Sequence, residues 1–385
     1  MKKAILIFKK EILDAVRDSR TFYVCIITPF LLYPILFMVM GYFIQSERTK
    51  EERLIYKIGI INQSLMEGFL THVEAAKNLD VVEGEEHLAM FKNNKVKAVL
   101  EVKNANGVVV FYDGADKESQ NALKRINKLL SEYQDAIIKK RILKQGLSEE
   151  ILMPIAVEKE NIAPAKRMGG FILGALIPYI LIIVAFQGAM RVGIDITAGE
   201  KERKTIETLL VTDVKRSEIV IGKCLAGFVL AFLSTISGLL GLVITLQSGF
   251  SVFTQIGRGL TLAIPWLSCL SMLFVMLPLL WFFSSVLVAI GSVSRSIKQA
   301  TTYGSYCLIA AVVLAVFSVL RITTPGRIIF LIPVLNTAIL QQQILVGEVY
   351  GINLLFTIVS SIFYAVIAYL FAKHNFEREE VLLRS

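Results

Sequence analysis

The sequence predicts an α-helical membrane protein with six transmembrane helices and an extracytoplasmic α/β domain between the first and second spans. Three observations lead to this prediction. Of the 385 residues, 55% are hydrophobic and 19% are charged, against about 25% charged in an average soluble protein. Charged residues of both signs concentrate between residues 45 and 166. The rest of the chain carries long apolar runs, which cross a bilayer as helices when they reach about 20 residues.

Six apolar segments are long enough to cross the hydrocarbon core. We predict spans at residues 22–44, 169–190, 219–246, 260–291, 301–320 and 351–372. The fourth is long enough to tilt, or to break at Pro265 or Pro278. Residues 1–21 form an amphipathic N-terminal segment before the first span. The other five helices form a transmembrane domain over 167–373, and residues 374–385 are a tail.

Basic residues are distributed unevenly between the two sides of the predicted spans. With the N-terminus inside, the inner loops and tails together with Lys223, near the inner end of the third span, hold 18 Lys and Arg, and the short outer loops hold three. The segment 45–166 is left out of this comparison, because large domains cross membranes largely regardless of their charge. The positive-inside rule therefore predicts that both termini are cytoplasmic. The formal net charge of +9 belongs to this pattern and does not indicate binding to nucleic acid.

The domain at 45–166 has the pattern of an α/β fold. Apolar runs predict strands at 56–62, 96–102 and 107–114, and helical spacing predicts helices at 65–76 and 117–144. An extended segment, 154–164, leads back to the membrane. We interpret the domain as a structural lid or assembly element. No cluster of residues typical of a binding site stands out, which favours this interpretation over a ligand-binding receptor role, the alternative that stays open.

Residues 321–348 form an apolar segment that is too broken to span a membrane. Pro325, Gly326, Pro333 and Gly347 interrupt it. Broken backbone at membrane depth is tolerated only against protein or a water-filled cavity. We therefore predict a re-entrant segment that enters from the outer side.

The inner loop after the second span carries the most distinctive pattern. Its first part is densely charged, and Ile206, Leu209 and Leu210 recur at helical spacing. This predicts a short amphipathic helix within 199–216, suited to dock in a groove of a soluble partner. The alternative is a helix that lies on lipid headgroups, where Lys and Arg usually dominate the polar face. We expect six side chains to contact the partner: Glu200, Arg203, Ile206, Glu207, Leu209 and Leu210.

A resemblance to a known family rests on three segments. Ala198–Leu210, AGEKERKTIETLL, resembles the loop after the second span in permeases of the ABC-2 type. Ile332–Glu348 and Ala372–Leu383 resemble the family's stretch before its last span and its C-terminal end. Within the family, the chain is most like the sodium-efflux permeases. The resemblance implies that the loop is a coupling helix, which receives motion from a separate ABC ATPase subunit.

The resemblance also implies an assembly and a function. Two copies of the ATPase subunit, which bind ATP and Mg, would pair with this chain and a second copy of it in a bacterial or archaeal cell membrane. The implied function is ATP-driven sodium efflux. Export of a drug, a peptide or another amphipathic compound stays open. An alternative of another class is a membrane receptor or scaffold with a ligand-binding outer domain.

Motifs for chemistry on this chain are missing from the sequence. There is no G-x-x-x-x-G-K-[ST] phosphate loop, so ATP must be hydrolysed on a partner subunit. G-x-S-x-G and H-E-x-x-H are absent as well, and we predict no catalytic residues. The four cysteines and three histidines lack the spacing of a disulfide framework or a metal site.

The predicted spans contain no carboxylate. A carrier driven by an ion gradient normally keeps an ionisable residue inside the membrane, so this absence favours ATP as the energy source. Carbonyls, hydroxyls and amides are still able to coordinate sodium. We predict that the transport path is lined by amides in apolar surroundings, Gln187, Asn336, Gln341 and Gln342. The alternative for each is a hydrogen bond to a neighbouring helix.

Overall fold

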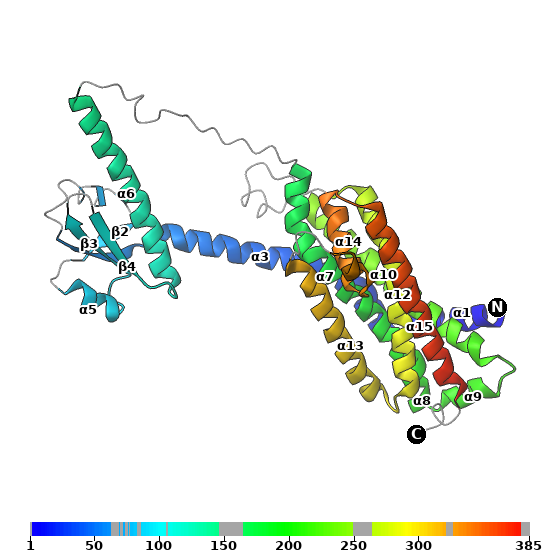
Figure 1. Cartoon of the computed structure of the whole chain (residues 1–385). Helices are drawn as coiled ribbons and strands as arrows, with labels where there is room; N and C mark the ends of the chain where they lie inside the picture. The colour runs from blue at the N-terminus through cyan, green and yellow to red at the C-terminus, as the bar shows by residue number, and fades with distance from the viewer. Residues whose placement is uncertain are drawn as a thin grey trace. The chain divides into compact units, whose positions relative to one another are not determined.

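The structure is a computed structural model of the whole chain. It describes residues 2–62, 86–104, 107–145, 165–248, 264–320 and 326–378, together with 69, 72–73, 76 and 78–82. The chain divides into two compact units. The bundle unit comprises Met1–Gly41 and Ile162–Ser385, and the sheet unit comprises Tyr42–Asn161. Figure 1 shows the long helices of the bundle unit running alongside one another.

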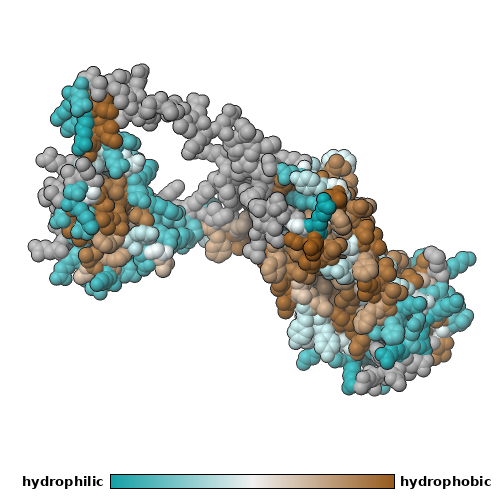
Figure 2. Space-filling view, viewed as in Figure 1, coloured by the Kyte–Doolittle hydropathy of each residue, from teal (hydrophilic) through white to brown (hydrophobic). Residues whose placement is uncertain are grey.

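Six helices among the described residues are long and apolar enough to cross a membrane. They are Ser19–Glu51, Leu173–Glu202, Arg216–Gln247, Trp266–Val293, Ile297–Phe317 and Gly351–Glu377. A mixed sheet lies between the first and second of them in the sequence. The predicted fold class is therefore confirmed. On the face of the bundle seen in Figure 2, apolar residues predominate and hydrophilic residues gather toward one end.

The bundle unit begins with a separate helix before the first span. Its first elements are α1 (Lys2–Arg17), α2 (Ser19–Phe22), the π-helical turn η1 (Tyr23–Ile27) and the first part of α3 (Thr28–Arg53). From Tyr42 onward, α3 belongs to the sheet unit. The chain re-enters the bundle as α7 (Ala165–Ile194), η4 (Asp195–Gly199), α8 (Glu200–Glu202), α9 (Thr205–Val211) and α10 (Arg216–Gln247). It ends with α12 (Trp266–Val293), α13 (Ile297–Phe317), η5 (Ser318–Leu320), η6 (Arg327–Leu331), α14 (Leu335–Val346) and α15 (Gly351–Glu377).

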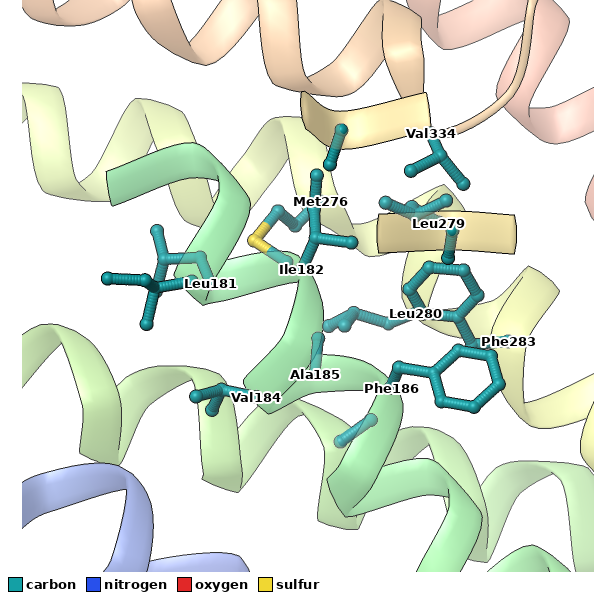
Figure 3. Packing of buried hydrophobic residues seen from close by; sticks show 14 of the residues in the cluster. Leu181, Ile182, Val184, Ala185, Phe186, Met276, Leu279, Leu280, Phe283 and Val334 are labelled. Carbon is teal, nitrogen blue, oxygen red and sulfur yellow. The ribbon is translucent and has the colours of Figure 1, made fainter. Parts of the chain in front are cut away.

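The centre of the bundle is an apolar core around α7. Helices α10, α12, α13 and α14 all pack against it. Phe186 of α7 meets Phe283 of α12 edge to face, with ring centroids 5.0 Å apart. Figure 3 shows these rings beside Leu280 and below Val334, which precedes α14. Because lipid is as apolar as these side chains, close packing holds such helices together more than the hydrophobic effect does.

Two details of the predicted spans differ in the structure. Of the two proposed breakpoints in the fourth span, only Pro265 bounds a helix, since α12 begins directly after it at Trp266. Pro278 lies inside the helix, which continues unbroken. The second span is longer than predicted, because α7 runs to Ile194 and helical structure continues through η4 and α8 to Glu202.

The predicted re-entrant segment folds as two short helices. Its first residues, 321–325, lie outside the described residues. η6 and α14 follow, and α14 buries most of its side chains against α7 and α12. Val334 and Gly347 flank α14 with positive φ angles of 71° and 86°. This cover satisfies the condition for broken backbone within a membrane, and the re-entrant path stays a prediction.

The sheet unit is built on a four-stranded sheet in the order β2-β1-β3-β4. The strands are β1 (Tyr56–Ile61), β2 (Leu79–Val81), β3 (Ala98–Asn104) and β4 (Gly107–Tyr112). β1 pairs in parallel with β2 and β3, and β3 pairs antiparallel with β4. α6 (Lys117–Lys144) contributes Ile126 and Tyr133 to a core with Ile58 and Leu100.

Sequence analysis predicted three of these strands and α6, but not β2 or the helix α5 (His87–Lys92). A three-residue strand and a six-residue helix are too short to show a periodic pattern. The extended segment 154–164 and most of the predicted helix 65–76 lie outside the described residues.

Candidate functional site

The site is built on the extension of α7 beyond the predicted second span. The π-helical turn η4 continues α7 to α8, and the helix stops where Lys204 takes a left-handed φ of 58°. π-Helical turns inside helices are often found at functional sites. A Cβ atom on Gly291 of α12 would lie 2.8 Å from the Cβ of Thr197. This close approach holds the extension against α12, so α8 is firmly placed.

Four charged residues meet beside α8, and we call them the ionic cluster: Lys10, Glu11, Glu200 and Lys223. Lys223 of α10 is fully buried. Its Nζ lies 2.6 Å from Oε2 of Glu200 and 3.0 Å from Oε1 of Glu11, and it also donates to the carbonyl of Ile196. Lys10 Nζ lies 2.6 Å from the other oxygen of Glu200. The cluster therefore joins α1, α8 and α10.

The charges in the ionic cluster balance. Glu11 and Glu200 are 2% and 5% exposed, and two lysines neutralise them. Buried charges need such pairing, because desolvation costs several kcal/mol per ion. Burial lowers the pKa of Lys10, but its contacts with Glu200 and Glu11 outweigh that effect, so its pKa is raised. Lys10 therefore keeps its charge at neutral pH.

The next two residues of α8 hold the connection between α12 and α13. Lys201 Nζ donates to the carbonyls of Ser292 and Ser294, at the C-terminal end of α12. Glu202 Oε2 accepts a hydrogen bond of 2.9 Å from the backbone nitrogen of Ile297, the first residue of α13. A cation at a helix C-terminus and an anion at an N-terminus are both favourable, because each faces unpaired backbone groups and the helix dipole.

Three consecutive residues thus bind different parts of the bundle. Glu200 holds α1 and α10, Lys201 holds the end of α12, and Glu202 holds the start of α13. We call α8 and these contacts the α8 clamp. In Figure 1, α8 and α9 lie at the end of the bundle where α1 and the last turns of α15 are found.

The predicted coupling helix 199–216 is not one helix. It comprises the end of η4, α8, a break at residues 203–204, α9, a second break at residues 212–215, and the first residue of α10. The apolar face of α9 also points the other way from the prediction. Ile206 is 3% exposed and packs with Leu209 against Ile219 of α10 and Phe376 of α15. In this structure the chain itself covers this face, and partner contact at Ile206 and Leu209 stays a prediction.

The six predicted contact residues therefore differ in whether they are buried in the chain or exposed. Glu200 is turned inward in the ionic cluster, and Ile206 and Leu209 pack internally. Arg203 is exposed and pairs with Asp195, and Glu207 is exposed on α9. The side chain of Leu210 lies outside the described residues. Partner contact at Arg203 and Glu207 stays a prediction.

The predicted path amides differ in their hydrogen-bond partners and burial, although three of them lie on α14. Asn336 Nδ2 donates to the hydroxyls of Ser360 and Ser361 at 2.9 and 3.0 Å, which ties α14 to α15. Gln342 Nε2 donates to the Ser318 hydroxyl at 2.8 Å, at the end of α13. These two amides bond neighbouring helices, the alternative considered for them. Gln187 is exposed on α7.

Gln341 differs from the other amides. It is fully buried on α14, and neither its nitrogen nor its oxygen has a hydrogen-bond partner among the described residues. Thr357 of α15 is also fully buried, and its hydroxyl has no hydrogen-bond partner among the described residues. An unsatisfied buried polar group costs about 1–3 kcal/mol. Water or a polar ligand would remove this cost.

Sequence analysis missed five residues of the site. It did not predict Lys10, Glu11, Lys201, Glu202 or Lys223 as site residues, although two of the five carried a signal. Glu11 lies on the buried face of α1 with Ile7 and Ala15, and Lys223 lies inside a predicted span. A charge at such a position predicts a buried partner, but the pattern does not identify which residue the partner is.

Two comparisons with known proteins bear on this site. The chain matches the model of the ABC-2 family transporter proteins over residues 5–381. It is also similar to the ABC transporter permease protein NatB of Bacillus subtilis (strain 168). The two sequences are 27% identical over 406 aligned positions, which cover 98% of each chain. Both similarities include the whole of the α8 clamp.

The contribution of the ionic cluster to the stability of the chain can be tested by replacing Lys223. Lys223→Met keeps most of the side-chain volume but leaves Glu11 and Glu200 buried with only the half-exposed Lys10 between them. We expect a loss of about 3–5 kcal/mol, typical when one partner of a buried ion pair is removed. Thermal unfolding of the purified chain in detergent measures this loss as a lower Tm. The control is Lys128→Met, because Lys128 is 79% exposed on α6 and lies 3.8 Å from Glu132. Equal Tm values for the two variants would contradict the assignment.

Proposed function

The chain belongs to the ABC-2 family of transporter proteins, and from this premise we propose that it exports sodium ions with energy from a separate ATPase. The family match and the six candidate spans make it a multi-pass membrane permease. Membership also implies an ABC ATPase partner. The family match thus favours a transporter over a receptor or scaffold.

The proposed complex contains two copies of this chain and two ATPase subunits, which hold the ATP and Mg. Both termini and the α8 clamp face the cytoplasm, and the sheet unit lies outside. The excess of basic residues, 18 against three, supports this orientation. Gln187 supports the second copy, because an amide exposed on a membrane-spanning helix is costly in lipid and needs a protein or aqueous neighbour.

The α8 clamp is the observation that carries the mechanism. When ATP closes the ATPase dimer, the ATPase surface that contacts Arg203 and Glu207 moves, and α9 moves with it. α8 follows, since only Arg203 and Lys204 separate it from α9. Its three contacts then shift α1, α10 and the α12–α13 connection together. This joint movement opens a path to the outside at the interface of the two copies.

Sodium as the cargo rests on two supports. The first is the resemblance to sodium-efflux permeases. The second is Gln341 and Thr357, buried neutral groups whose oxygens have no hydrogen-bond partner in the part of the chain that the structure describes. Carbonyl and hydroxyl oxygens suit a hard cation, and neutral ligands release it more readily than carboxylates do.

Sodium-22 uptake tests this function directly. Inverted vesicles contain the chain with its ATPase subunit and a proton uncoupler. We expect ATP-dependent uptake, which disappears when the phosphate-loop lysine of the ATPase is replaced. If there is no uptake although the chain still stimulates ATP hydrolysis, the sodium proposal is wrong. The cargo would then be an amphipathic compound carried by the same mechanism.

Gln341 and Asn336 separate a transport role from a structural one. We expect Gln341→Leu to reduce uptake severalfold without lowering Tm, because the amide it removes has no partner among the described residues that would be left unsatisfied. Asn336→Leu is the matched control, and it should lower Tm by leaving Ser360 and Ser361 without their donor. Uptake and Tm are measured on the same preparations. Unchanged uptake by Gln341→Leu would remove this residue from the path.

Glu207 tests the surface proposed for the ATPase. Reversing its charge in Glu207→Lys should weaken binding of the ATPase subunit about tenfold, equivalent to ~1.4 kcal/mol, and reduce stimulation of ATP hydrolysis. Tm should not change, because the side chain is exposed. Copurification of the ATPase with tagged permease measures the effect. Glu132→Lys, at a 56% exposed side chain of α6, is the control. Equal copurification with both variants would place the docking surface elsewhere.

A further inference from the structure

Helix α1 carries two different apolar surfaces. One is turned toward the bundle, where Ala4, Ile7, Glu11 and Ala15 are buried. α10 packs closely there, since a Cβ atom on Gly222 would lie 2.8 Å from the carbonyl oxygen of Ala4. The ionic cluster is part of this surface. The opposite surface is the one that the function proposed above does not use.

The outward face of α1 exposes four large apolar side chains. They are Ile5, Leu6, Leu13 and Val16, which are 47%, 71%, 49% and 65% exposed. At 100° per residue they fall on one side of the helix, away from Ile7 and Glu11. Such a face is unfavourable in water and needs an apolar cover.

Cations are interspersed with these apolar side chains. Lys2, Lys9 and Arg17 are exposed, and the helical spacing places Lys9 between Leu13 and Val16. Among the described residues of α1, the only exposed carboxylate is that of Asp14. A helix with Leu, Ile and Val on a basic surface typically lies in the plane of the membrane interface, where its cations meet anionic headgroups.

The start of the first span places this face at the membrane boundary. α1 ends at Arg17, and the first candidate span begins two residues later at Ser19. Asp18 between them caps the span, since its carboxylate accepts hydrogen bonds from the backbone nitrogens of Arg20 and Thr21. Hydrogen bonding to Thr21, together with the hydrogen bonds from Arg20 and Arg191, lowers the pKa of Asp18. The join is short and ordered, so the outward face stays next to the lipid headgroups.

We propose that the outward face of α1 is a docking surface for anionic phospholipid headgroups. The apolar side chains enter the boundary between headgroups and acyl chains, and Lys2, Lys9 and Arg17 pair with the lipid phosphates. On its other side the same helix presents Lys10 and Glu11 to the α8 clamp. The lipid contact therefore steadies the ionic cluster, a consequence that rests on the function proposed above.

Labelling of an introduced cysteine tests the lipid contact without the ATPase. Leu6→Cys is placed in the full-length chain, which is reconstituted in zwitterionic vesicles or in vesicles rich in phosphatidylglycerol. A water-soluble maleimide then labels it, and labelling of the parent chain is subtracted. We expect labelling to be about tenfold slower in the anionic vesicles, because each cation near an anionic surface favours binding. Asp14→Cys, on the polar edge of α1, should be labelled equally in both.

A second variant links the protection to charge. Lys9→Gln together with Arg17→Gln should abolish the difference between vesicles, while Lys128→Gln on α6 should preserve it. Rapid labelling of Leu6→Cys in both vesicles would overturn the proposal. Equal protection in both would overturn the role of anionic headgroups. Protection that appears only when the ATPase subunit is added would assign the face to that protein instead. None of these outcomes depends on sodium transport, so they leave the proposed function untouched.

Discussion

A single buried ammonium group sets the arrangement of the cytoplasmic end proposed for this permease. Lys223 has no exposed surface and is held between Glu11 and Glu200. None of the three charges is stable in a low-dielectric interior without the others, because the cost of desolvation is recovered only by close pairing. α1, α8 and α10 therefore stay together or expose the whole cluster to water. Membrane helices have little hydrophobic drive to associate, so such an electrostatic constraint has a large effect.

The order of charges in α8 suits the groups around it. Glu200 faces Lys223. Lys201 places its cation at the C-terminal carbonyls of α12, and Glu202 places its carboxylate at the first backbone nitrogen of α13. Any other order of the same three residues would place a charge against a helix end of the wrong sign. The π-helical turn before α8 and the left-handed Lys204 after it bound this short rigid element. In the proposed mechanism, a movement of α9 is passed to several helices through this single turn.

The four amides illustrate how much depends on neighbours. Asn336 and Gln342 bond hydroxyls of adjacent helices, Gln187 is exposed, and Gln341 is buried without a described partner. In sequence all four look alike, as amides in apolar surroundings. Only the positions of Ser318, Ser360 and Ser361, fixed by packing, distinguish them. This is why sequence analysis, which predicted a transport role for the amides, left helix bonding open as the alternative for each.

Features that depend on local pattern could be predicted from the sequence alone. Apolar length predicted six spans, and periodicity predicted β1, β3, β4 and α6, because these properties are read within one segment. Tertiary structure decided which charges are buried, since Lys223 lies 23 residues from Glu200 and 212 from Glu11. It also decided the direction of α9. An amphipathic pattern requires a cover for its apolar face, but only packing shows whether that cover is another protein or, as here, the chain itself.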